Sequence, residues 1–167
     1  MTAPDDLICP ASSIFDAVQT RSAIDAANAT LTDPRDIRRA TVDILTAAQK
    51  VGRDAIQAAF EAAPFDARPT TRAYSYLTDH LVGETLYVAT TYLHPLPNPT
   101  ESERLSLIAV GGYGRGEMAP QSDVDLLFLT PYKITPWAES MIESMLYILW
   151  DLKLKVGHAS RTIKDCL

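Results

Sequence analysis

The stretch that decides the fold reads LSLIAVGGYGRGEMAPQSDVDLLFL and occupies residues 105–129. It begins with an apolar run, continues through a glycine cluster that holds one arginine, and ends with a second apolar run headed by two aspartates. Short apolar runs bounded by turn residues are typical of buried strands. Two strands joined by a glycine-rich loop, with acidic residues at the head of the second, would suit a nucleoside triphosphate and its metal ions.

The glycine cluster directly follows the first apolar run. Gly111 and Gly112 lack side chains, so their backbone amides can approach a bulky anion closely. Arg115 lies between two further glycines and is able to pair with phosphate oxygens as a fork. We expect these three residues, and Ser122 in the turn that follows, to bind a nucleotide. A glycine-rich loop alone is also compatible with a tight connection between two strands.

Asp123 and Asp125 are separated by one residue at the head of the second apolar run. Strand geometry points both side chains to the same face, with their Cα atoms about 7 Å apart. Two negative charges at that separation repel each other by roughly 2 kcal/mol at an effective dielectric constant near 20. A divalent cation between them reverses that sign, and magnesium prefers oxygen ligands. We therefore expect a metal site, although an Asp-x-Asp sequence also occurs in solvated turns.

Residues 33–93 are expected to form a helical arm. Asp33 followed by Pro34 is typical of a helix start. Apolar residues at steps of three and four predict a first helix of about 28 residues that ends near residue 64. Its stripe consists of Ile37, Thr41, Ile44, Ala48, Val51, Ala55 and Ala59. A second helix is predicted over about residues 70–93, and its buried side would hold Leu77, Leu81, Val88 and Tyr92.

Two segments flank this arm. Residues 1–32 hold scattered prolines, serines and alanines with weak periodicity, so we expect a flexible leader with one marginal helix near residues 14–28. Residues 94–104 contain three alternate prolines, which cannot continue a helix or a central strand and therefore indicate a linker. Residues 105–167 then form the core of an α+β protein with a small mixed sheet.

Three further elements are predicted after residue 129. A helix starts at Pro136 and places Trp137, Met141, Met145 and Leu149 on one side. Alternating apolar and charged residues over 150–156 predict a half-exposed strand. Another helix begins near Thr162, in the last residues of the chain.

The composition of the 167-residue chain is that of a soluble globular protein, with 47% hydrophobic and 22% charged residues. The net charge of −6 and the absence of a basic run argue against nucleic acid as the main partner. Cys9 and Cys166 lie at opposite ends and make no metal-ligand spacing. No secretory leader pattern and no apolar run near the roughly 20 residues of a membrane span is present. We expect a cytoplasmic protein without a membrane partner.

Two glycines, ten intervening residues and Asp-x-Asp resemble the signature of the polymerase-β-type nucleotidyltransferase superfamily. In more detail, VGGYGRGEMAPQSDVDLLFL and LWDLKLKVGHASRT resemble the amino-terminal transferase domain of the bacterial PII uridylyltransferase/uridylyl-removing enzymes. The likeness covers residues 105–167. It implies the fold of that superfamily, truncated, because family members are several times longer. The chain is therefore expected to be an amino-terminal fragment whose transferase core is incomplete at its carboxyl end.

The resemblance also implies which residues form the site. Asp123 and Asp125 would hold two magnesium ions, and a third carboxylate would stand on a neighbouring strand. Asp151 is the candidate for this third catalytic and metal-binding position, because it begins the strand predicted over 150–156. For His158 and Arg161, in VGHASRT, contact with substrate and a structural role remain equally open.

The implied reaction transfers UMP from UTP to a tyrosine of the nitrogen regulatory protein PII and releases pyrophosphate, through a two-metal in-line displacement. Two alternatives stay open at this point. The chain could transfer an adenylyl group to another protein, such as glutamine synthetase. It could also be a non-catalytic module that binds a nucleotide, or a partner along the helical arm.

Overall fold

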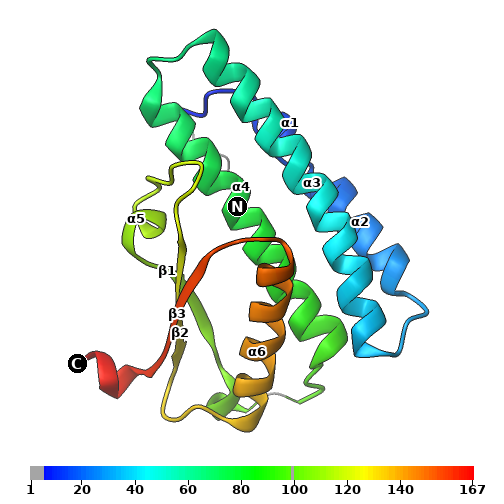
Figure 1. Ribbon diagram of the computed structural model, residues 1–167. Coiled ribbons are helices and arrows are strands. Elements are labelled where there is room, and N and C mark those ends of the chain that lie inside the picture. The colour runs from blue at the N-terminus through cyan, green and yellow to red at the C-terminus, as the bar shows by residue number, and fades with distance from the viewer. Residues whose placement is uncertain (1–5, 99) are drawn as a thin grey trace.

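A three-stranded sheet packs against a layer of long helices, as the sequence predicts for an α+β chain (Figure 1). The structure is a computed structural model and describes residues 6–98 and 100–167. The first five residues of the predicted leader and residue 99 of the predicted linker lie outside the described residues.

The helical arm is a hairpin of α3 (Pro34–Ala62) and α4 (Ala67–Val88), continued by a π-helical turn, η1 (Ala89–Leu93) (Figure 1). The start of α3 is as predicted: Pro34 takes the first helical position, and the Asp33 carboxylate accepts a hydrogen bond of 2.8 Å from the amide of Arg35. Both predicted helices are therefore confirmed, with their ends within a few residues of the expected positions.

The buried face of α3 differs from the predicted stripe beyond its second turn. Val51, expected in the stripe, is 63% exposed. The cause lies at Gly52, where a Cβ atom would collide with the carbonyl oxygen of Ile14 and the side chain of Leu77. Because only a glycine lets these neighbours approach so closely, the face centred on Gly52 is the one that packs. The buried residues of α3 are Ile37, Thr41, Leu45, Gln49, Gly52 and Ile56.

The prediction of a flexible leader is wrong for residues 6–32. This segment forms α1 (Ala11–Ile14) and α2 (Ala17–Asn28), the second of which is the expected marginal helix. Ile14, Phe15 and Ile24 are all buried, with at most 4% exposure. Three large apolar side chains at irregular spacing give little periodic signal, yet they are sufficient to pack the segment onto the hairpin.

The sheet has the order β1-β2-β3, with β1 antiparallel and β3 parallel to the central strand. Its strands are β1 (Ser106–Ala109), β2 (Val124–Thr130) and β3 (Val156–Thr162). Between the parallel strands runs α6 (Pro136–Asp151), which buries Met141, Met145 and Leu149 as predicted. The remaining short elements are η2 (Glu101–Glu103), α5 (Gly111–Gly114) and η3 (Ile163–Cys166), the last at the site of the predicted final helix.

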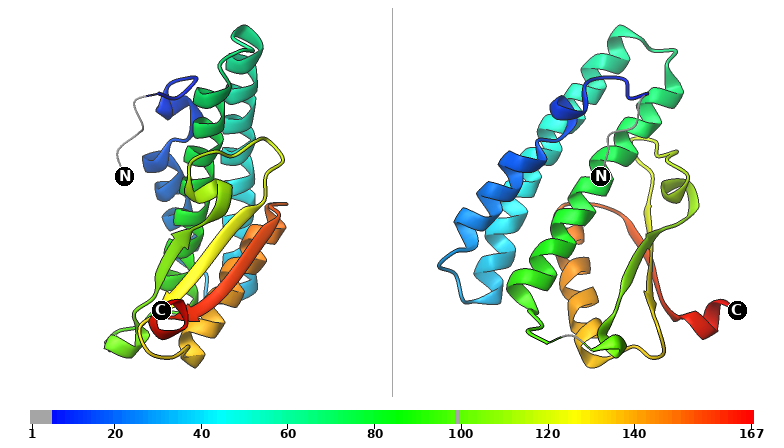
Figure 2. Two further views of the ribbon diagram at one scale, coloured as in Figure 1. Left: turned by 90° about the vertical axis from the view of Figure 1, so that its left-hand side faces the viewer. Right: turned by 180° about the vertical axis from the view of Figure 1, so that it is seen from behind.

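The two faces of the sheet have different environments. Along β2, alternate residues beginning with Val124 are buried against the helices, whereas Asp125, Leu127 and Leu129 lie half-buried on the other face. The left view of Figure 2 looks onto this second face and shows the long helices α3, α4 and α6 behind the strands. We call it the open face. The alternation predicted for a strand therefore presents Asp125 to solvent.

The strand predicted over residues 150–156 is wrong. Helix α6 continues to Asp151, and Lys153, with a φ of 62°, ends it in the left-handed region. Leu152 and Leu154 are both buried, so their alternation with lysines belongs to the turn that leads back to the sheet. The strand itself begins only at Val156.

The arm and the sheet share one hydrophobic core, which extends from Ile14 to Leu154. Polar contacts also join them: the indole nitrogen of Trp137 donates to the carbonyl oxygen of His94 at 2.9 Å, and the His94 ring lies 2.8 Å from the hydroxyl of Ser144. The start of the proline-rich segment is thus fixed to α6. Among the residues that the structure describes, no helix combines the length and the apolar content that a membrane crossing would need.

Candidate functional site

The glycine cluster, expected as a loop, forms the short helix α5 directly after β1. Gly111 has a φ of 63°, which L side chains rarely adopt, so glycine is needed at this bend. Next to it, the amide of Val110 donates to the carbonyl oxygen of Asp125 at 3.0 Å, and the amide of Gly114 donates to that of Val110 at 2.9 Å. These bonds fix the cluster beside the head of β2.

Tyr113 anchors α5 to the helical arm. Its side chain is 5% exposed, and its hydroxyl donates a hydrogen bond of 2.8 Å to Asp79 of α4. Burial raises the pKa of the Asp79 carboxyl, while the bond from Tyr113 opposes that rise. Burial and the nearby Asp79 together raise the pKa of Tyr113, so the hydroxyl keeps its proton and remains the donor. Neither residue was predicted as part of the site; a tyrosine inside a glycine run was the only available signal.

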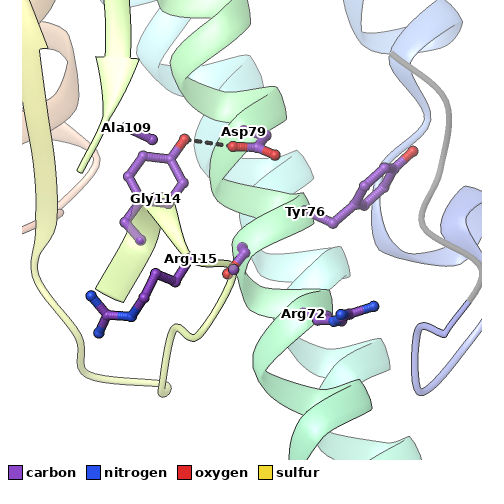
Figure 3. A pocket seen from close by; sticks show the side chains of 9 residues that line it. Arg72, Tyr76, Asp79, Ala109, Gly114 and Arg115 are labelled. Atoms are coloured by element: carbon purple, nitrogen blue, oxygen red, sulfur yellow. Dashed lines mark hydrogen bonds between the residues drawn. The ribbon is translucent and has the colours of Figure 1, made fainter. Parts of the chain in front are cut away.

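A cavity of about 480 Å³ lies between α4 and α5 (Figure 3). The Tyr113–Asp79 bond lies in its wall, and the side chains of Arg72 and Arg115 point away from each other. Each arginine already has an acidic partner, which is Asp6 for Arg72 and Glu117 for Arg115. Asp125 is not among the lining residues, so this cavity is separate from the acidic pair of the predicted site.

The Asp125 carboxylate lies on the open face, in a cavity of about 340 Å³ that it shares with Val110, Gly157, His158 and Arg161. A Cβ atom built on Gly111 would stand 2.8 Å from its Oδ2 atom. One built on Gly157 would stand 2.5 Å from its Oδ1 atom. The carboxylate is therefore cradled between the end of β1 and the strand β3, in space that any side chain at either glycine would fill.

Asp123 immediately precedes β2 and is exposed. Within residues 6–98 and 100–167, no cation lies within ion-pair distance of Asp123 or Asp125, in contrast to the seven ion pairs formed elsewhere. Two unpaired carboxylates at the head of one strand are oxygen donors of the kind that magnesium prefers. The part of the chain that the structure describes contains no group of three or more histidine, cysteine or acidic residues that could hold a metal ion alone.

The placement of Asp151 on a strand beside the acidic pair is wrong. Asp151 is the last residue of α6, and its carboxylate lies 3.5 Å from the Nε atom of Arg38 in α3. The residue of β3 that pairs with Asp125 is Gly157. Neither β1, with the sequence SLIA, nor β3, with the sequence VGHASRT, carries a carboxylate. The neighbours of β2 thus supply no third acidic ligand.

The other predicted residues are distributed around the glycine turn and the edge of the sheet. Arg115 reaches within 3.9 Å of the position that a Cβ on Gly112 would take, and its Nε atom donates to Glu117 at 2.8 Å. The Ser122 hydroxyl accepts a hydrogen bond of 2.8 Å from the amide of Ala119 and so closes the turn before β2.

His158 and Arg161 take different positions on the edge strand β3. His158 pairs with Leu126 in the sheet and also lines a groove beside α6. Arg161 pairs with Leu129 and borders the cavity that contains Asp125. The structure therefore places Arg161, more than His158, toward the open face.

Comparison with known proteins gives a match to one family model. Residues 99–155, which include β1, α5, β2 and α6, match the family model described as a nucleotidyltransferase domain. The segment that holds the glycine turn and the acidic pair thus matches a nucleotidyltransferase domain.

More specific similarity extends over most of the chain. It is 60% identical to the bifunctional uridylyltransferase/uridylyl-removing enzyme of Ruegeria pomeroyi over 92% of its length, and 59% identical to that of Cereibacter sphaeroides over 96%. It spans only 17% and 18% of those relatives, respectively. No solved structure matches the chain significantly. Over most of its length the chain is thus similar to bifunctional uridylyltransferase/uridylyl-removing enzymes, as the sequence resemblance predicts.

Proposed function

We propose that this chain carries the site that transfers UMP from UTP to a tyrosine of the PII protein and releases pyrophosphate. The observation that carries the proposal is the Asp125 carboxylate, which is unpaired among the described residues and lies on the open face against the glycine turn. The relatives are named uridylyltransferases, which supports UMP as the transferred group.

Each residue of the site has a distinct role in this proposal. The backbone of Gly111 and Gly112 receives the phosphates, because no side chain keeps a bulky anion away. Asp123 and Asp125 would hold magnesium, which, when bound, supplies the positive charge that favours displacement at the α-phosphorus. Asp151 is given no role in this proposal, because its carboxylate is paired with Arg38 on the helical side.

Arg115 and Ser122 assist from the rim. The ion pair of Arg115 with Glu117 is 65% and 61% exposed, and such a pair contributes only about 0–1 kcal/mol. The Arg115 guanidinium can therefore leave Glu117 and pair with a phosphate of the nucleotide at little cost in free energy. The Ser122 hydroxyl accepts a bond within its turn, which leaves its hydrogen available to a phosphate oxygen.

The transfer itself is a single displacement. The phenolic oxygen of the acceptor tyrosine forms a bond to the α-phosphorus as the bond to the β-phosphate breaks. The two terminal phosphates leave as pyrophosphate, the phenolic proton passes to water, and UMP remains on the tyrosine. In this proposal Arg161, which lines the Asp125 cavity, contacts the substrates on this face.

The test offers the chain UTP or ATP labelled at the α-phosphate, with magnesium and PII. Label on PII from UTP supports the proposal, and label from ATP alone would overturn it in favour of adenylyl transfer. Binding of UTP with magnesium is measured in parallel, because it reports on the site separately from the transfer step. If Asp125→Asn and Asp123→Asn leave both binding and transfer unchanged, the acidic pair is not the site.

A further inference from the structure

The position of the Asp125 carboxylate is set by space rather than by hydrogen bonds. Among the residues that the structure describes, no donor or cation contacts either of its oxygens, although its backbone oxygen accepts the bond from Val110. Its Oδ2 faces Gly111 and its Oδ1 faces Gly157, at 2.8 and 2.5 Å from where their Cβ atoms would be. Two missing side chains, from two different strand ends, therefore define where this carboxylate lies.

Of the two glycines, only Gly111 has a second reason to be glycine. Its φ of 63° excludes most side chains whatever the surrounding space. Gly157 is not among the glycines with positive φ, and it lies within the regular register of β3 opposite Asp125. A glycine inside a strand lowers stability and often marks a close approach of other groups. Here the group that approaches is the carboxylate.

We propose that Gly157 is a positioning residue. Because it has no side chain, it leaves a slot beside β3 that the Asp125 carboxylate occupies, turned toward the glycine turn. This inference rests on the proposed function, because it assigns the slot a purpose in holding a metal-bound nucleotide. An alanine at 157 pushes only the far end of a flexible side chain, so the strand persists and the carboxylate turns away. We therefore expect the added methyl group to leave the fold intact and to disturb only the metal site.

The experiment compares Gly157→Ala with a matched control, Gly83→Ala, in the full 167-residue chain. Gly83 lies in α4, and no atom lies within 4 Å of the position that a Cβ atom on it would take, so its methyl group fills open solvent. Binding of Mn²⁺, with and without UTP, is followed by electron paramagnetic resonance, and thermal unfolding reports the fold. We expect Gly157→Ala to bind the ion about tenfold more weakly or worse, as for groups that orient metal ligands, with an unchanged or higher melting temperature. The control should bind as the wild type does.

A double variant separates positioning from a general effect on the sheet. In the Asp125→Asn background, Gly157→Ala should weaken Mn²⁺ binding no further, because the ligand that it displaces is already lost. Equal losses in both backgrounds would overturn the inference, as would wild-type affinity in Gly157→Ala.

Crystal structures of the wild type and Gly157→Ala distinguish failure of this inference from failure of the proposed function. If the wild type binds no Mn²⁺ with UTP, the proposed function fails. The slot is then judged by the Asp125 carboxylate alone: displacement in Gly157→Ala supports it, and an unmoved carboxylate overturns it.

Discussion

The helical arm and the open face of the sheet treat acidic side chains in opposite ways. In the arm, Glu84 is 4% exposed and receives two hydrogen bonds from Arg21, at 2.6 and 3.0 Å. Asp25 of α2, which packs on the arm, accepts hydroxyl bonds of 2.8 Å from Tyr87 and Tyr92 of the arm. On the open face, Asp125 has no such partner among the described residues. The arm uses its charges to hold itself together, whereas the open face keeps its charges available for a ligand.

The largest expected effect is on the open face. Asp125→Asn should lower metal-dependent transfer by several kcal/mol of transition-state stabilisation, on the order of 10²-fold to 10³-fold in kcat/KM. Its unfolding free energy should stay the same or rise slightly, because no native partner is lost. Steady-state kinetics and urea denaturation measure the two quantities. A variant that unfolds more easily by more than about 1 kcal/mol would show that Asp125 is structural.

The arm and the helix α2 that packs on it should show the reverse pattern. Arg21→Ala leaves the Glu84 carboxylate, with its side chain 6% exposed, without its ion-pair partner. We expect a loss of about 2–3 kcal/mol in unfolding free energy, at or below the lower end for a broken buried pair because Arg21 is itself 38% exposed. Affinity for Mn²⁺ with UTP should not change.

A surface pair provides the control for that variant. Lys50 and Asp54 form an ion pair with 76% and 62% exposure, so Lys50→Ala should cost no more than about 0.5 kcal/mol. Equal losses in Lys50→Ala and Arg21→Ala by urea denaturation would contradict the contrast between buried and exposed pairs.

Tyr113 joins the two regions, and its loss should affect both moderately. Tyr113→Phe removes the donor to Asp79, which costs about 1–2 kcal/mol because a partly buried acceptor loses its bond. Since the same bond holds α5, UTP affinity should fall as well. Calorimetric titration with UTP and magnesium, alongside denaturation, checks both effects. Loss of stability at full UTP affinity would mean that the anchor does not position the glycine turn.

The smallest effect concerns pH and lies in the arm. Burial lowers the pKa of His80 from 6.5, and its ring stacks on Phe15 at 4.7 Å. The unfolded chain thus binds this proton more readily than the folded chain, so stability should fall as pH drops below 6.5. The slope of unfolding free energy between pH 7 and 5 should be shallower in His80→Gln. An unchanged slope would assign the pH dependence to other groups.

The sequence predicted the long helices well because their signals are local. Asp33 and Pro34 start α3 as expected, and the apolar run from Val124 forms the central strand. The errors arise where tertiary contact decides. The face of α3 is set by a close approach at Gly52, and residues 150–156 alternate because a turn, rather than a strand, buries two leucines.

The candidate site was predictable only in part for the same reason. The acidic pair and Gly111 follow from residue types along one stretch of sequence. Asp79 and Gly157 reach the site through the packing of α4 and β3, and no local sequence pattern predicts that they do so. Asp151 was assigned to the site through a strand that does not form, and its actual partner is Arg38.

The central claim is that the open face keeps Asp123 and Asp125 for a cation that accompanies a nucleotide. The most direct test measures the unfolding free energy of the wild type and of the Asp123→Asn, Asp125→Asn double variant, with and without Mn²⁺ and UTP. At a hundred times the dissociation constant, the wild type should gain about 2.7 kcal/mol. The double variant should gain almost nothing under the same conditions. Equal stabilisation of both proteins would contradict the account.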